Sequence, residues 1–126
     1  MSTLKVDTIE DLSAGTSVDA TYVVNGTAKV WVNLKGTDTF GVTGSVNLTS
    51  ATDNSAGDYT LTIASDMADV TYTITTGITH DSANDLHDFC PAPQRLTGSY
   101  DHETATGAGT KGDQGFVGSV VMGTLA

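Results

Sequence analysis

The sequence predicts an all-β protein, an antiparallel β-sandwich or meander of about seven strands preceded by an N-terminal arm. Apolar residues alternate with polar ones at a period of two, β-branched residues dominate the alternating stretches, and turn-forming residues separate them. No stretch combines apolar residues at helical spacing with capping residues at its ends. With 126 residues, the chain has the length of a single domain.

Residues 1–17 are expected to form a docking arm and linker outside the sandwich. Leu4, Val6 and Ile9 give a weak apolar pattern, and the small polar residues of 13–17 follow them. We expect the arm to dock on another subunit, with these three side chains as candidate subunit contacts. A frayed terminus is the alternative.

Alternation predicts the strands of the sandwich domain, which we expect to cover residues 18–126. The predicted strands are Ala28–Leu34, Ser45–Thr49, Asp58–Ala64, Val70–Thr75 and Gly115–Leu125. In the first of them, Trp31 opposes the apolar face. We therefore expect Trp31 to contact a second subunit or the other sheet. Packing in a second layer and stacking on a ligand are the alternatives.

Turn chemistry predicts two reversals between strands. Asn25-Gly26 is a strong hairpin signal between a strand at 22–24 and the strand that begins at Ala28. The run at 53–57, with sequence DNSAG, predicts a second turn because Asp and Asn side chains hydrogen-bond their own backbone.

Residues 77–114 are expected to form an irregular loop. This segment holds all three histidines, the single cysteine Cys90 and both prolines, and long irregular segments are usually functional loops or disorder. We expect part of it to face a receptor. The candidate receptor contacts are His87, Phe89, Arg95 and Tyr100.

No metal, cofactor or catalytic residue is predicted. Several side chains of the irregular segment could ligate zinc or iron, with His87 and Cys90 at a suitable spacing. These candidate ligands are His80, Asp81, Asp85, His87, Asp88, Cys90 and His102. A paired Cys-x-x-Cys is missing, and loop histidines are usually solvated, so we predict no site. Calcium at 53–58 and a nucleotide at the glycine-rich run 107–112 are rejected because the flanking residues do not fit either motif.

Charge and composition exclude several classes of partner. The net charge is −10 with only five lysines and arginines, so neither nucleic acid nor an anionic membrane surface is expected to bind. No apolar run is long enough to span a membrane, and secretion by a signal peptide is not expected, because the N-terminal residues lack a basic segment followed by an apolar one. A single cysteine excludes an intrachain disulfide. The low apolar content, 38%, favours a homo-oligomer that completes its burial between copies.

Four segments resemble, in order, motifs of the tail-fibre proteins of marine and other tailed phages. Residues 28–37 (AKVWVNLKGT) are similar to the family pattern Ala-Lys-x-Trp-x-Asn-Phe-x-Gly-Thr, with Leu34 where the family usually has Phe. Residues 46–61 hold a strand, an Asp-Asn turn and then Gly-Asp-Tyr-Thr, as in that family. Residues 67–72 are similar to its next turn and strand, and residues 2–9 (STLKVDTI) to its N-terminal start.

The resemblance implies a non-enzymatic virion protein, assembled in the host cytoplasm, that forms a short trimeric fibre or spike module. The implied partners are further copies of the chain, other virion proteins and carbohydrate of the host cell surface. A capsid decoration or cement protein that clamps neighbouring shell subunits is the alternative, because the chain is shorter than most fibres. A free-standing carbohydrate- or small-molecule-binding module is the third hypothesis.

Overall fold

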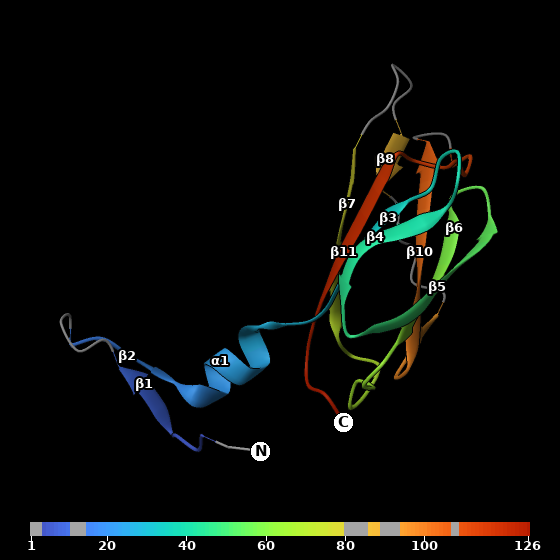
Figure 1. The fold of residues 1–126 in the computed structure, drawn as a ribbon. Helices are drawn as coiled ribbons and strands as arrows, with labels where there is room; N and C mark the ends of the chain where they lie inside the picture. Colours follow the sequence, from blue (N-terminus) through green and yellow to red (C-terminus); the bar gives the residue numbers. More distant parts are fainter. Residues whose placement is uncertain (1–3, 11–14, 80–85, 89–93, 107–108) are drawn as a thin grey trace.

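The computed structural model describes residues 4–10, 15–79, 86–88, 94–106 and 109–126. It is mostly antiparallel β-structure, with two packed sheets and a short N-terminal arm, which confirms the predicted all-β sandwich (Figure 1). The elements are β1 (Thr8–Glu10), β2 (Ser17–Asp19), α1 (Ala20–Gly26), β3 (Ala28–Lys35), β4 (Gly41–Val46), β5 (Leu48–Ser55), β6 (Asp58–Ile63), β7 (Thr73–Thr79), β8 (Leu86–Asp88), β9 (Arg95–Leu96), β10 (Ser99–Thr106) and β11 (Phe116–Met122).

The sandwich consists of a four-stranded sheet in the order β4-β3-β11-β7 and a five-stranded sheet in the order β5-β6-β10-β8, with β9 paired to β10. All pairs are antiparallel. The C-terminal strand β11 lies between β3 and β7, so the predicted final strand is confirmed and occupies the interior of its sheet. The outer face of that sheet is therefore built from segments far apart in the sequence.

The core lies between the two sheets and follows the predicted alternation. Every second residue of β3 and β6 is buried, beginning with Val30 and Tyr59 respectively. The buried apolar residues are Val30, Val32, Leu34, Tyr59, Leu61, Ile63, Met67, Tyr72, Tyr100, Ala105, Val117 and Val121. The outward positions of β3 include Trp31 and Asn33, as the period of two requires.

The predicted hairpin at Asn25-Gly26 is wrong, because both residues lie in helix α1. The Asp19 carboxylate caps the start of this helix by accepting a hydrogen bond from the Thr21 N–H at 2.7 Å. At the other end, the Lys29 ammonium donates to the carbonyls of Val24 and Thr27. Capping at both ends stabilises a helix that buries no residue and has no apolar periodicity to detect.

The arm extends further than predicted. Strand β2 pairs with β1, and the Ala20 N–H donates to the Asp7 carbonyl at 2.8 Å, which ties the start of α1 to the hairpin. The sandwich therefore begins with β3 at Ala28 rather than at residue 18. Figure 1 shows the hairpin and helix projecting from one end of the sandwich.

Two predicted boundaries near the turns also shift. The strand predicted over Ser45–Thr49 is divided at Asn47, whose φ of 58° ends β4 and starts β5 in the other sheet. The turn predicted over 53–57 is confined to Ala56 and Gly57, because β5 continues to Ser55. Gly57 has a φ of 66°, which explains the glycine at this position.

The prediction of an irregular loop over 77–114 is wrong for much of its length. Strand β7 runs to Thr79, and β10 pairs with β6 across the middle of the five-stranded sheet. The inward positions of β10 include Tyr100, His102 and Thr104, all buried. Because two of these three residues are polar, alternation of hydrophobicity did not identify the strand.

Candidate functional site

The outer face of the four-stranded sheet carries the most site-like arrangement in the described residues. Register places outward positions of β3, β11 and β7 in two adjacent rows. The first row is Trp31, Val120 and Thr75, and the second is Asn33, Gly118 and Gly77. The two glycines of the second row carry no side chain, and the face is hollowed between them and Trp31.

The hollow has a volume of about 300 Å³. Its lining is Trp31, Asn33, Thr75, Thr76, Gly77, Gly118, Ser119 and Val120. A methyl group built on Gly77 would meet no atom within 4 Å, so the space above this glycine is open. A methyl group on Gly118 would lie 3.2 Å from Cε1 of Phe116 and 3.3 Å from Oδ1 of Asn33, so these two side chains cover Gly118.

Trp31 forms one wall of this hollow and is half-buried. Its Cζ3 and Cη2 atoms would lie 3.2 and 3.3 Å from a methyl group on Gly44, so the six-membered ring leans over the neighbouring strand β4. The outward placement predicted for Trp31 is confirmed. Its contact with a second subunit stays a prediction.

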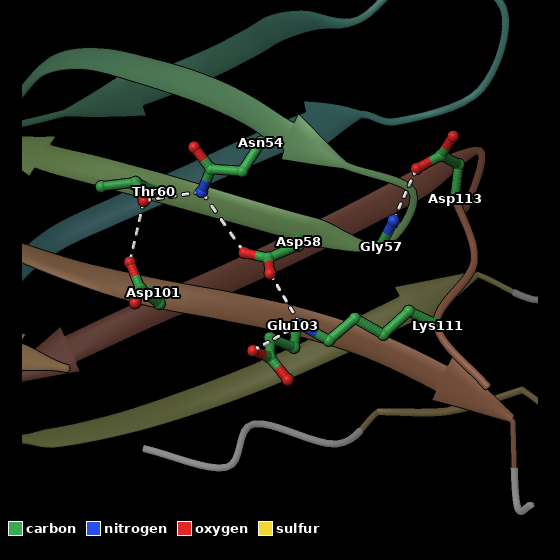
Figure 2. A network of polar contacts seen from close by, with 8 residues as sticks. All are labelled: Asn54, Gly57, Asp58, Thr60, Asp101, Glu103, Lys111 and Asp113. Carbon is green, nitrogen blue, oxygen red and sulfur yellow. Dashed lines mark hydrogen bonds and ion pairs between the residues drawn. The ribbon is translucent and has the colours of Figure 1, made fainter. Parts of the chain in front are cut away.

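A polar network covers the outer face of the other sheet (Figure 2). The Lys111 ammonium lies 2.6 Å from Oδ2 of Asp58 and 2.8 Å from Oε1 of Glu103. The hydrogen bond from Lys111 holds the pKa of the Asp58 carboxyl below its usual range, and both carboxylates raise the pKa of the Lys111 ammonium. The network cross-links β6, β10 and the segment before β11, which is a structural function.

Asparagine and threonine extend the network along the sheet. The Asn54 amide donates to Oγ1 of Thr60 at 2.8 Å, and the Thr60 hydroxyl donates to Oδ1 of Asp101 at 2.9 Å. Asn54 also donates to Asp58 at 3.3 Å. The predicted turn-forming role of Asn54 is therefore replaced by a role that joins neighbouring strands.

Asp113 clamps the turn between β5 and β6. Its Oδ1 accepts hydrogen bonds from the Gly57 N–H at 2.7 Å and from the Tyr59 hydroxyl at 3.0 Å (Figure 2 shows the Gly57 bond). Burial, followed by this carboxylate, raises the pKa of Tyr59 well above its usual range. A side chain at Gly36 would overlap the Tyr59 hydroxyl, so Gly36 and Tyr59 depend on each other. Gly36, Gly57 and Tyr59 belong to the segments that resemble the fibre motifs, and their role here is to stabilise the fold.

The four candidate receptor contacts do not form one exposed surface. Tyr100 is fully buried, with its hydroxyl 2.7 Å from Oγ of Ser119, so its prediction as a receptor contact is wrong. Arg95 is exposed on β9 and donates to the Tyr72 carbonyl at 3.0 Å. His87 lies on β8, where the structure describes only the backbone, and Phe89 lies outside the described residues.

Of the seven candidate metal ligands, the structure describes only the side chain of His102. His102 is buried in the core on β10, which corrects the expectation of a solvated loop histidine. Within the described ranges, no group of three or more His, Cys, Asp or Glu side chains could hold a metal ion. His80, Asp81, Asp85 and Cys90 lie outside those ranges.

The arm presents a second candidate surface. Its exposed large apolar residues are Leu4, Val6, Ile9, Val18, Tyr22 and Val24. Leu4 is 85% exposed and Tyr22 is 75% exposed, although each could bury its side chain in a core. A hollow of about 390 Å³ lies among residues of the N-terminal segment and α1, including Leu4, Val6 and Val24. Among the described helices, none is long and apolar enough to cross a membrane.

Comparison with known proteins found no relative of this chain. No protein-family model, no curated protein and no solved structure matches the chain.

Proposed function

We propose that this chain is a non-enzymatic structural protein of a tailed-phage virion, a short trimeric fibre or spike module assembled in the host cytoplasm. The observation that supports this most strongly is the arm, which projects from its own sandwich (Figure 1). Its large apolar side chains are exposed. The four motif resemblances to phage tail fibres favour the same function. In this proposal the arm docks on other copies of the chain and the sandwich is displayed.

The energetics of the arm favour a partner. Burying one valine, leucine or isoleucine side chain stabilises a complex by about 1.5–3 kcal/mol. In the isolated chain, Leu4 leaves most of this stabilisation unused, and Val6 and Ile9 leave nearly half of it unused, because these side chains remain 85%, 45% and 48% exposed. A seven-residue helix and a short two-stranded hairpin are also marginal by themselves, so contact with a partner would stabilise their structure.

The test is the solution mass of the full chain by light scattering after size-exclusion chromatography. The wild-type chain is expected to be a trimer, and Val6→Asp is expected to dissociate it because a carboxylate would have to be buried. Val70→Asp is the matched control, since Val70 is 48% exposed outside the arm and Val6 is 45% exposed within it. Both variants should retain the far-ultraviolet circular dichroism of the sandwich.

A monomeric wild-type chain would contradict the trimeric fibre module. A wild-type trimer that Val6→Asp leaves intact would show that the arm does not hold the copies together.

A capsid decoration or cement protein is the second candidate, and the same arm favours it. A projecting hairpin and helix could lie across neighbouring shell subunits and clamp them. Adding the wild-type chain and Val6→Asp to undecorated phage heads distinguishes the two functions. Arm-dependent attachment of a monomeric chain to heads would support decoration instead of the fibre.

A further inference from the structure

We propose that the hollow beside Trp31 binds one ring of a neutral saccharide. This inference rests on the proposed function only for its biological setting, since display on a virion would bring the hollow to a cell surface. The binding chemistry follows from the two rows of residues on β3, β11 and β7. It also replaces the predicted receptor contacts, of which Tyr100 is buried.

An aromatic wall is the first feature that fits a sugar. One face of a pyranose ring carries mainly C–H groups, and these pack on the electron-rich face of an indole. Trp31 is the only tryptophan in the chain, and it lines the hollow together with Gly77, above which the space is open. The space of about 300 Å³ lies at the lower end of the range for ligand pockets.

Uncharged polar groups are the second feature. Asn33 supplies both an amide donor and a carbonyl acceptor, and Thr75 supplies a hydroxyl that can donate and accept. Neither side chain makes a hydrogen bond to another described residue that would use these groups. Sugar hydroxyls need such mixed donors and acceptors, because each hydroxyl both donates and accepts.

Charge selects a neutral ligand. The chain has a net charge of −10, yet among the described residues no carboxylate and no cation lines the hollow. The two lysines that face outward on the same strand have other partners, since Lys29 caps α1 and Lys35 pairs with Asp38 at 3.0 Å. An anionic sugar would therefore meet a negative protein without a compensating cation. Affinity at one shallow site is expected to be weak, and several copies on one particle would raise it.

The alternative occupant is a second copy of the chain, because exposed Val46, Val120 and Met122 flank the hollow on this face. The uncharged hydrogen-bonding groups and the open space above Gly77 favour the sugar. The experiment separates the two occupants.

The first measurement is a glycan array carrying neutral and sialylated glycans, probed with the wild-type full chain and two variants. Gly77→Leu fills the hollow, and a side chain there meets no atom at Cβ. Gly41→Leu is the matched control, because Gly41 is also free of neighbours at Cβ but lies outside the hollow on β4. The second measurement is the fluorescence of Trp31 during titration with a neutral glycan that the array identifies.

The expected result is binding of neutral glycans by the wild-type chain and by Gly41→Leu. Gly77→Leu should bind roughly tenfold more weakly or not at all. The emission of Trp31 should change on titration of the wild-type chain, since the ring would leave water on one side.

Three results would overturn the proposal. The first is a blank array with correctly assembled protein, and the second is glycan binding that Gly77→Leu leaves unchanged. The third is a solution mass of Gly77→Leu that differs from that of the wild type, when neither protein binds any glycan. The last result would assign the hollow to a second copy. If the wild-type chain forms a trimer that depends on the arm but the glycan array is blank, the sugar site is refuted and the proposed fibre module is not. The sugar site and the fibre module therefore fail separately.

Discussion

The clamp at Asp113 offers the sharpest test of how this fold is stabilised. Asp113→Ala removes an acceptor for the Gly57 N–H at 2.7 Å and for the Tyr59 hydroxyl at 3.0 Å. Both donor residues are buried. A hydrogen bond to a charged acceptor contributes about 1.5–3 kcal/mol, so two of them set an upper limit of about 3–6 kcal/mol. Asp113 itself is half-buried, and water can replace part of its contribution, so we expect a loss of about 2–3 kcal/mol.

The assay is urea unfolding at pH 7, followed by circular dichroism at one fixed protein concentration, because association would couple to stability. With a slope of about 1–3 kcal/mol per molar urea, the midpoint should fall by about 1 M or more. Tyr59→Phe removes only one of the two bonds and should cost about 1 kcal/mol. Asp113→Asn keeps a neutral acceptor and should lie between the alanine variant and the wild type.

Asp53→Ala is the control for the lost charge, because Asp53 is an exposed carboxylate on β5. It should change the free energy of unfolding by less than about 0.5 kcal/mol. If Asp113→Ala and Asp53→Ala destabilised the protein equally, the clamp would not hold the turn and the reasoning would be refuted.

Two further predictions follow from the same sheet. Gly57→Ala should lower the free energy of unfolding by about 3 kcal/mol or prevent folding, since φ is 66° and the new Cβ would lie 2.6 Å from the Gly112 N. A thermal melt checks this, and a midpoint near that of the wild type would contradict it. Lys111→Met should cost about 0.5–1 kcal/mol at pH 7 and less in 1 M salt. Because the pKa of Asp58 is lowered in the folded protein, this stabilisation is present above about pH 4 and is lost as the pH falls through the folded pKa. Because the pKa of Lys111 is raised, the stabilisation persists until the pH rises above about 10. Urea unfolding at pH 2.5, 7 and 11 checks that window, and a difference that persists at pH 2.5 would exclude the ion pairs as its cause.

Alternation of apolar and polar residues was enough to predict the strands at the centre of the fold. In β3 and β6 every inward position is apolar, so the period of two is visible in the sequence and the structure confirms it. The same parity predicted that Trp31 points away from the core. These features are local, because a strand alternates whatever its neighbours are.

Local patterns failed where capping or polar burial decides the structure. Helix α1 depends on Asp19 and Lys29, which bond its two ends, and it has no apolar stripe. In β10 the inward positions carry His102 and Thr104, so the strand was mistaken for a loop and Tyr100 for a receptor contact. Pairing with β6 buries these residues, and a single sequence does not show which strand will pair.

The sequence by itself determined that the chain is an antiparallel β protein with an outward tryptophan and an acidic surface. Only the tertiary structure decided what surrounds that tryptophan. Trp31, Gly118 and Gly77 come from three strands, and they meet because the C-terminal strand β11 enters between β3 and β7. Strand order and register depend on long-range pairing and packing of the whole sheet, whereas alternation along one strand depends only on the backbone.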